Sequence, residues 1–352
     1  MLKIAVIGGD GIGPEVVAEG LKVIETAAQK TGLEYVCDHF DISGSRYLAR
    51  GGDPKQASIP VIEDDEIERL RNYDAIYFGA VGHPDIAPGI LERGLLLKLR
   101  FDLDQYINLR PVRLFSGVES SLRDKKSEDI DFVVIRENTE DLYCGIGGRM
   151  RVGTPAEVST QTMVATRYGV ERCLRFAFET ARRRKNEGYP GKLTLVHKTN
   201  VLIHCGQTWF QAFEEIGERE FPEIEREYHH VDACCMYMAT RPELYDVIVT
   251  SNMFGDIITD LGAAIAGGMG MAASGNINPE PGERNVSMYE PVHGSAPDIA
   301  GKQQANPVAA ILSAGMMLIQ TGYIRGNELA IETGRKIEDA VCQVLPKLKE
   351  YG

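Results

Sequence analysis

Short β-branched runs alternate with longer segments of helical spacing, and this alternation constrains the fold more than any other feature of the chain. Residues 3–7 predict a strand, and residues 15–30 follow with the spacing of an amphipathic helix. Residues 35–40 and 75–79 predict further strands, and residues 58–71 predict a turn and a charged helix between them. Strands that alternate with helices predict an α/β fold with a parallel sheet.

The same alternation continues to the end of the chain. Strands are predicted at residues 131–136, 193–198, 227–233 and 247–250, and helices at 166–186 and 207–219. Residues 94–114 predict a helix that runs into a strand ended by Pro111, and residues 308–319 predict a buried helix. A chain of 352 residues is longer than one hydrophobic core usually serves, so two domains are expected.

The charge balance excludes some classes of protein. A formal net charge of −13 argues against a nucleic-acid binder, which needs a basic surface to meet phosphates. No apolar stretch has the length of a membrane span, and the first residues lack the pattern of a secretory signal. The seven cysteines are an odd number without metal-site spacing, which favours reduced thiols and a cytoplasmic location.

Asp256 and Asp260 are four residues apart in FGDIITDLG, so on a helix they lie one turn apart on one face. Adjacent carboxylates repel each other unless a cation lies between them, and Mg²⁺ or Mn²⁺ prefers such oxygen ligands. A solvated helix face is the alternative that this spacing alone leaves open. Asp232, predicted after a strand, is a possible third ligand.

Basic and phenolic side chains suggest a site for an acidic substrate. Arg100, Arg110, Arg113 and Arg136 lie near predicted strand ends or helix faces, where arginine forks match carboxylates, although each alone is also an ordinary surface arginine. Tyr143 and Lys198 form a possible proton-transfer pair, because partial burial beside a metal lowers the pKa of a lysine. The alternative for Lys198 is a strand-end lysine with its charge in solvent.

Two glycine-containing segments compete as the nucleotide site. The first, GGDGIGPE, follows a strand but lacks the third glycine of G-x-G-x-x-G, so a classical Rossmann fold is disfavoured. The second, HGSAPDIAG at residues 293–301, offers backbone N–H groups for phosphate, a histidine for stacking and Asp298 for a ribose diol.

Together these segments resemble the isocitrate/isopropylmalate dehydrogenase family of β-decarboxylating dehydrogenases. The resemblance spans nearly the whole chain and rests on five motifs in family order: GDGIGPE at the start, NLRP at 108–111, RENTE at 136–140, SNMFGDIITD at 251–260 and EPVHGSAPDIAGK at 290–302. It implies a two-domain α/β fold of this family, not a classical Rossmann fold. Residues 1–105 with 267–352 would form the cofactor-side domain, and 106–266 the dimerisation and substrate/metal domain.

The resemblance also implies a role for each matching residue. The substrate carboxylates would be held by Arg100, Arg110 and Arg136, and Mg²⁺ or Mn²⁺ would be held by Asp232, Asp256 and Asp260. Tyr143 would protonate carbon after CO₂ leaves, and Lys198 would accept the hydroxyl proton. Lys198 and Asp232 would come from the partner subunit of a homodimer or higher homo-oligomer with shared active sites, and residues 149–162 would form an interlocking arm. The cofactor would be lined by Ile12, His293, Gly294, Ser295, Ala296, Asp298, Ile299 and Asn306.

The implied reaction is oxidative decarboxylation of a small malate-like 2-hydroxy diacid. NAD is expected because Asp298 would repel the additional phosphate of NADP. Gly94 and Leu96 stand where family members that act on isocitrate carry serine and asparagine, which disfavours isocitrate and homoisocitrate. Leu96 and Leu97 match the leucine pair of isopropylmalate enzymes, but Arg93 departs from that pattern.

Three other segments, DQYINLRPVRL, GMAASGNINPE and SMYEPVHG, resemble the D-malate/tartrate branch, and D-malate or tartrate is therefore the expected substrate. The alternative is 3-isopropylmalate, which would place the chain in leucine biosynthesis. A metal hydrolase without a nucleotide and a non-catalytic regulatory subunit are further alternatives. NADH production would exclude the first, and the presence of Tyr143, Lys198 and the three aspartates argues against the second.

Overall fold

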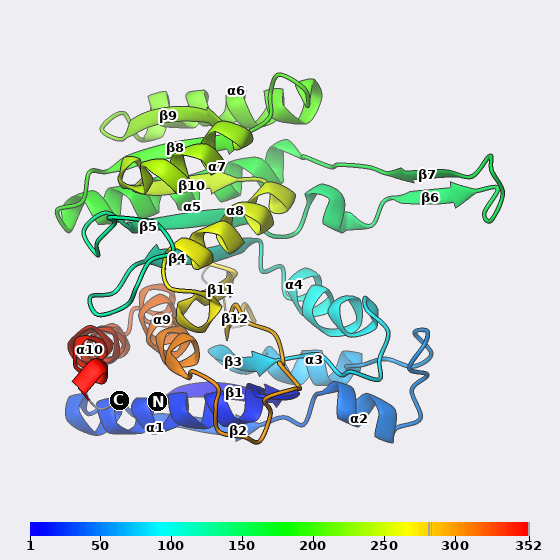
Figure 1. Cartoon of the computed structure of the whole chain (residues 1–352), viewed down its shortest axis with the longest axis vertical. Coiled ribbons are helices and arrows are strands. Elements are labelled where there is room, and N and C mark those ends of the chain that lie inside the picture. The colour runs from blue at the N-terminus through cyan, green and yellow to red at the C-terminus, as the bar shows by residue number, and fades with distance from the viewer. Residues whose placement is uncertain (281, 283, 351–352) are drawn as a thin grey trace. The chain divides into compact units, whose positions relative to one another are not determined.

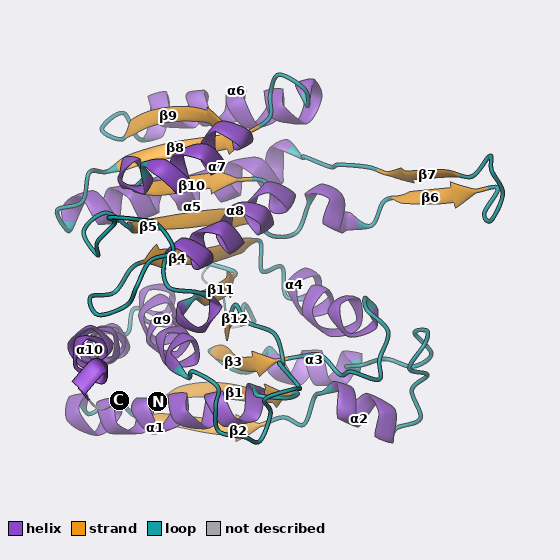
Figure 2. Cartoon of the chain, viewed as in Figure 1, coloured by secondary structure: helices purple, strands orange, loops and turns teal. Residues whose placement is uncertain are grey.

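The computed structural model describes residues 1–280, 282 and 284–350, and the chain divides into two compact units. The first unit comprises residues 1–105, 113–127 and 263–352, and the second comprises 106–112 and 128–262. Residues 113–127, expected in the middle domain, thus group with the first unit. Figures 1 and 2 show both units as sheets covered by helices, so the predicted α/β class is confirmed.

The first unit contains a mixed sheet. Its strands follow the order β2 (Tyr35–His39), β1 (Leu2–Gly9), β3 (Ala75–Ala80), β12 (Ser287–Pro291) and β11 (Ala273–Ile277). β1 runs parallel to β2 and β3, β12 runs parallel to β3, and β11 runs antiparallel to β12. A sheet of this kind departs from the classical parallel dinucleotide fold, as the resemblance implied.

Helices cover both faces of this first sheet. The long helices α1 (Gly13–Thr31), α9 (Val308–Arg325) and α10 (Glu328–Val344) pack against one another, and α1 and α9 also pack on the strands. The core of the other face is formed with α2 (Gly44–Ala49), α3 (Asp64–Leu70), the π-helical turn η1 (Glu92–Leu97) and α4 (Lys98–Asp102). Short 3-10 turns occur at η4 (Met269–Met271) and η5 (Leu345–Glu350).

Helix α9 has the length and hydropathy of a membrane span, but its environment explains its composition. It runs for 18 residues with a mean hydropathy of 1.3, and 61% of the segment is buried inside the protein. Ala309, Ala310, Met317 and Leu318 are fully buried in it. An apolar helix that packs in this way against a sheet and two helices is typical of a protein core.

The parallel strands of the second unit and their neighbour β4 follow the order β4 (Ile107–Arg113), β5 (Asp131–Glu137), β10 (Val247–Thr250), β8 (Lys192–His197) and β9 (Glu225–His230). β5, β10, β8 and β9 are parallel. In Figure 1, α5 (Arg167–Asn186) and α6 (Ile203–Glu220) lie behind this sheet, and α7 (Val231–Thr240) and α8 (Asn252–Ile265) lie in front of it. The carboxyl ends of the parallel strands therefore lead into the turns that carry the expected site residues.

Shorter elements complete the second unit. They are the 3-10 turns η2 (Asp141–Cys144) and η3 (Pro242–Leu244) and the antiparallel hairpin of β6 (Gly147–Met150) and β7 (Val158–Gln161). Figure 1 shows this hairpin extending away from the rest of its unit.

Two local predictions were wrong. Pro111 lies inside β4 rather than at its end, because proline disrupts a strand only where a neighbour needs its missing N–H group. The strand predicted at 227–233 ends at His230, and Val231 begins α7, so Asp232 lies in the first turn of a helix. The helix dipole favours an acidic residue at that position. The strand-like sequence pattern did not reveal that a helix begins there.

Candidate active site

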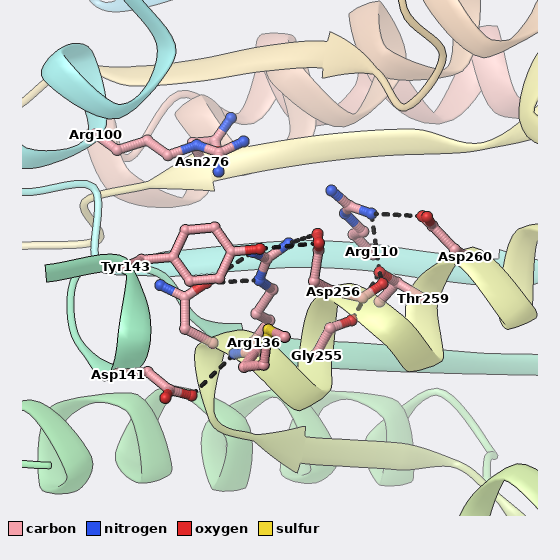
Figure 3. A network of polar contacts seen from close by, with 12 residues as sticks. Arg100, Arg110, Arg136, Asp141, Tyr143, Gly255, Asp256, Thr259, Asp260 and Asn276 are labelled. Carbon is pink, nitrogen blue, oxygen red and sulfur yellow. Dashed lines mark hydrogen bonds and ion pairs between the residues drawn. The ribbon is translucent and has the colours of Figure 1, made fainter. Parts of the chain in front are cut away.

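The centre of the candidate site is a buried arginine near the end of β5. Only 1% of Arg136 is exposed, and its Nε and Nη2 donate to Asn252 Oδ1 at 2.9 and 2.7 Å. Its Nη1 donates to Asp256 Oδ1 at 2.5 Å (Figure 3). The guanidinium therefore has a fixed orientation, and it faces the first two turns of α8.

Tyr143 contacts the same carboxylate from the turn η2. Its hydroxyl donates to Asp256 Oδ2 at 2.9 Å, and its ring lies 5.2 Å from the Arg136 guanidinium carbon (Figure 3). Burial is the main cause that raises the pKa of Tyr143 above its ordinary value, and the Asp256 charge adds to it. Tyr143 is therefore protonated at neutral pH, which is the state that a proton donor requires.

The two aspartates of α8 have opposite pKa shifts. Burial alone would raise the pKa of Asp256, but the charge of Arg136, the Tyr143 hydroxyl and Arg110 together lower it. The pKa of Asp260 is raised, because burial and the nearby Asp256 charge outweigh the attraction of Arg110. Arg110 Nη1 lies 3.6 Å from Asp260 Oδ1 and donates to Thr259 Oγ1 at 2.8 Å. The pair thus lies on one helix face beside two arginines, as their spacing predicted.

Close packing at Gly255 fixes the distance between α8 and Arg136. A Cβ atom at Gly255 would lie 2.4 Å from Arg136 Cγ and 2.7 Å from its Cβ, which no real side chain tolerates. The helix can approach the arginine this closely only because this residue is glycine.

Sequence reasoning missed two residues that hold this cluster. Asp141 is 2% exposed, has a φ of 69°, and accepts from the N–H groups of Met253 at 2.9 Å and Leu142 at 2.7 Å. Asn252 donates through Nδ2 to the Glu140 carbonyl at 3.2 Å, besides accepting from Arg136. The RENTE loop is thereby attached to the first turn of α8. A polar residue directly before a predicted helix was the available signal for Asn252.

Lys198 and Asp232 form a second, separate pair in the same unit. Lys198 follows the last residue of β8, and its Nζ lies 2.5 Å from Asp232 Oδ1 in the first turn of α7. The hydrogen bond from Lys198 is the largest cause of the lowered pKa of Asp232. Within the described residues, no three His, Cys, Asp or Glu side chains gather as a metal site. Asp232 therefore does not join Asp256 and Asp260 within one chain.

Chemically, the carboxylates fit a hard divalent cation. Asp256 and Asp260 provide partly exposed oxygens on adjacent turns, and burial together with the Asp256 charge raises the pKa of Asp260, so a bound cation would favour the charged form of this carboxylate. Mg²⁺ and Mn²⁺ are held by such carboxylates together with water and substrate oxygens. Two carboxylates from one chain leave room for further ligands.

In the first unit, Arg100 is held by a buried carboxylate. Its Nη2 lies 3.3 Å from Glu290 Oε1, which also accepts from Asn276 Nδ2 at 2.8 Å. The expected substituent-reading residues Leu96 and Leu97 lie on η1, and both are half-buried. This segment is a π-helical turn rather than a regular helix, and such turns occur frequently at functional sites.

The expected cofactor residues of the first unit are partly brought together. The Ile12 N–H donates to the Ser295 carbonyl at 2.8 Å, and Ala296 has a φ of 38°. A Cβ at Gly11 would lie 2.0 Å from that carbonyl, so the first turn and the 293–301 loop are in direct backbone contact. His293 and Gly294 continue this loop, Asp298 is exposed, and Asn306 accepts from the Val308 N–H at 3.0 Å.

Asp10 holds segments of the same region together, and the sequence patterns did not identify it. It is 4% exposed, and its carboxylate accepts from the N–H groups of Gly44 at 2.8 Å, Ser45 at 3.1 Å and Gly82 at 3.2 Å. Asp10 thus connects the glycine-rich turn to the start of α2 and to the turn after β3.

Comparison with known protein families identifies the class of protein to which this arrangement belongs as a dehydrogenase. The sequence profile of isocitrate/isopropylmalate dehydrogenases matches residues 3–351, and the chain belongs to this family. The expected family, and the expectation of an enzyme of the dehydrogenase type, are confirmed.

Individual proteins of known class show how similar this chain is to them in sequence and in structure. A 3-isopropylmalate dehydrogenase of Thermobifida fusca is 50% identical over 351 residues, which cover 100% of this chain and 93% of the relative. A 3-isopropylmalate dehydrogenase of Corynebacterium efficiens is 52% identical over 332 residues, which cover 94% of this chain and 91% of the relative. Among solved structures, an isocitrate dehydrogenase from Methylococcus capsulatus matches with a TM-score of 0.81 and 37% identity, covering 99% of this chain and 91% of the other.

These relatives overturn the expected D-malate or tartrate specificity, because the curated relatives at about 50% identity are 3-isopropylmalate dehydrogenases. The error has a physical reason. The segments that suggested the D-malate branch fall mainly on β4, β11 and β12, and every residue of β11 and β12 is buried. Most buried strand positions report how strands pack rather than which substrate binds. Arg93, which departs from the sequence pattern of isopropylmalate enzymes, is exposed at the start of η1.

Proposed function

We propose that this chain catalyses the NAD-dependent oxidative decarboxylation of 3-isopropylmalate with Mg²⁺ or Mn²⁺. The observation that carries the proposal is the Arg136–Tyr143–Asp256 cluster in a chain about 50% identical, over its full length, to 3-isopropylmalate dehydrogenases. The cluster supplies a carboxylate-binding cation, a protonated phenol and a metal-type ligand within hydrogen-bond distance of one another.

In this proposal, three arginines bind the carboxylates of the malate core. Arg136 and Arg110 are buried, and neighbours on α8 fix their orientation, so little side-chain entropy is lost when a substrate binds. Arg100 is oriented by Glu290 in the same way. Leu96 and Leu97 contact the isopropyl group, since a half-buried leucine pair gains from covering an apolar substituent and gains nothing from a hydroxyl.

Tyr143 and Lys198 move the protons. Lys198 accepts the proton of the substrate C2 hydroxyl, and its pairing with Asp232 fixes the position of its amine. Tyr143 then delivers its hydroxyl proton to carbon after CO₂ has left. Asp232, Asp256 and Asp260 hold the divalent cation, which when bound polarises the C2 oxygen and stabilises negative charge there.

The 293–301 loop and Ile12 bind NAD, which when bound accepts a hydride from substrate C2. Backbone N–H groups of Gly294, Ser295 and Ala296 suit phosphate, and Ile299 and Asn306 line the nucleotide with His293. Asp298 is exposed and accepts the ribose hydroxyls, and its charge disfavours the additional phosphate of NADP.

A homodimer with shared sites completes the proposal, and the cytoplasm is its proposed location. The resemblance assigns Lys198 and Asp232 to the site of the partner subunit, which agrees with their separation from the Asp256 cluster. The β6–β7 hairpin exposes Ile146, Met150, Val152 and Val158, an apolar surface of the kind that a second subunit covers.

The test is NADH formation by the purified chain with Mn²⁺, compared across 3-isopropylmalate, D-malate, tartrate and isocitrate. We expect turnover to be fastest with 3-isopropylmalate and to disappear when a chelator removes the metal. Asp256→Asn provides the matched inactive control. A preference for isocitrate or D-malate would overturn the assigned substrate, and metal-independent turnover would overturn the assigned metal residues.

A further inference from the structure

His197 is a fully buried polar residue to which the proposed mechanism gives no role. It is the last residue of β8 and directly precedes Lys198. Its exposure is 0%, and neither ring nitrogen has a hydrogen-bond partner in the part of the chain that the structure describes. Burial lowers the pKa of His197 to about 4, so the ring is neutral at neutral pH. A buried polar ring without partners is unfavourable, so its position calls for an explanation.

The ring packs between two helices. Its centroid lies 5.4 Å from that of Phe254, at an interplanar angle of 88°, which is an edge-to-face contact. It lies 6.1 Å from the ring of Trp209 in α6. Phe254 is in the first turn of α8, two residues before Asp256. One side chain thus connects the end of β8 with the helix that carries both aspartates.

Gly206 leaves just enough space for this arrangement. A Cβ atom at Gly206 would lie 3.2 Å from His197 Nδ1 and 2.9 Å from Thr199 Cα. The residues on both sides of Lys198 therefore rest against the same glycine of α6. A six-membered ring is larger than imidazole and would have little space at this point.

Thr199 fixes the other side of Lys198. Its N–H donates to the Tyr228 hydroxyl at 3.1 Å, and the two hydroxyl oxygens are 2.8 Å apart. The Lys198 carbonyl accepts from the Leu202 N–H at 2.8 Å. Lys198 stands between these two fixed residues, and its amine contacts Asp232 in the first turn of α7.

We infer that His197 and Gly206 are positioning residues, which hold the strand end so that the Lys198 amine is presented beside Asp232. The small aromatic ring fills the space between α6 and α8, and the glycine allows the strand end to approach α6. This role deepens the proposed function, on which its catalytic consequence rests.

Two variants perturb the same contact from opposite sides. His197→Leu removes the ring while keeping an apolar side chain of similar size, and Gly206→Ala presses a methyl group against the unchanged ring. Thr194→Val is the matched control, because Thr194 is buried on the same strand and its hydroxyl also has no partner among the described residues.

The first measurement is independent of catalysis. Limiting acetic anhydride labels lysine amines, and peptide mass spectrometry gives the extent of labelling of Lys198 relative to Lys192, which lies at the start of β8 and pairs with Glu227 at 2.9 Å. We expect this ratio to rise about threefold in both variants, because an amine that is no longer held against Asp232 is more accessible to the reagent. Simple unfolding would expose both lysines and keep the ratio near that of an unfolded chain.

The second measurement is steady-state turnover of 3-isopropylmalate. We expect kcat to fall about tenfold or more in both variants, with KM within about twofold, because a misplaced base slows chemistry without loosening the substrate. Thr194→Val should leave both quantities unchanged. An unchanged labelling ratio in both variants would overturn the inference, and so would a raised ratio with an unchanged kcat. If the unmodified chain turned over none of the substrates, the proposed function would fail, and the labelling ratio alone would decide the role of His197.

Discussion

Replacing Tyr143 by phenylalanine separates the chemical role of this residue from its structural role. The variant loses one hydrogen bond of 2.9 Å to Asp256 and keeps the ring that lies 5.2 Å from the Arg136 guanidinium carbon. A hydrogen bond to a charged carboxylate contributes about 1.5–3 kcal/mol to stability. The Asp256 side chain is 43% exposed, so water can replace the hydroxyl, and the net loss of stability should be smaller.

The expected effect on catalysis is much larger. Removal of a positioned proton donor costs about a hundredfold to ten-thousandfold in rate, which corresponds to about 3–5 kcal/mol in the activation barrier. Because this exceeds the expected loss of stability, Tyr143→Phe should unfold at nearly the same denaturant concentration as the unmodified chain and yet turn over very slowly.

Rapid mixing with 3-isopropylmalate, NAD and Mn²⁺ provides the decisive assay. Tyr143 acts after hydride transfer in the proposed sequence, so the variant should form NADH in its first turnover and then stall. A steady-state kcat within about twofold of the unmodified chain would refute the reasoning. Loss of the first-turnover NADH would refute the assigned order of steps.

Three further predictions follow from the same cluster and from the buried histidine. Gly255→Ala should lower stability by about 1–3 kcal/mol, because the added methyl overlaps the inner atoms of Arg136. Chemical denaturation would measure this loss, and Gly148→Ala, where a Cβ meets nothing within 4 Å, should have almost no effect. Asp256→Asn should abolish Mn²⁺ binding in calorimetry, and retained affinity would contradict its role as a ligand. Burial lowers the pKa of His197 to about 4, so the folded chain favours the neutral ring. As pH falls from about 6.5 towards 4, the unfolded chain binds a proton that the folded chain does not, and the folded chain therefore loses stability. His197→Leu should therefore unfold less steeply with acid than the unmodified chain, and identical acid profiles would refute this sign.

Much of the fold could be predicted because its signals are local. β-Branched runs and helical spacing depend on a few neighbouring residues, so most strands and helices were found within a few positions. The juxtaposition of Asp256 and Asp260 was predictable for the same reason, because the helical period alone places residues four apart on one face.

The supports of the site could not be predicted, because their partners are distant in sequence. Asp141 caps Met253 across 112 residues, and Asp10 accepts from Gly82 across 72. Neither aspartate stands in a pattern that distinguishes it from a surface carboxylate. The π-helical turn at Leu96 was also hidden, because apolar spacing does not distinguish a π-helical turn from a regular helix.

The chain contains a single tryptophan, and the buried position of this residue has a practical consequence. Trp209 is 2% exposed, and its ring neighbours the imidazole of His197 at the end of β8. All indole fluorescence of the unlabelled protein therefore originates beside the backbone that presents Lys198. A change in this emission on mixing with metal and substrate, in the absence of NADH, would time the local motion of that strand end without an engineered probe.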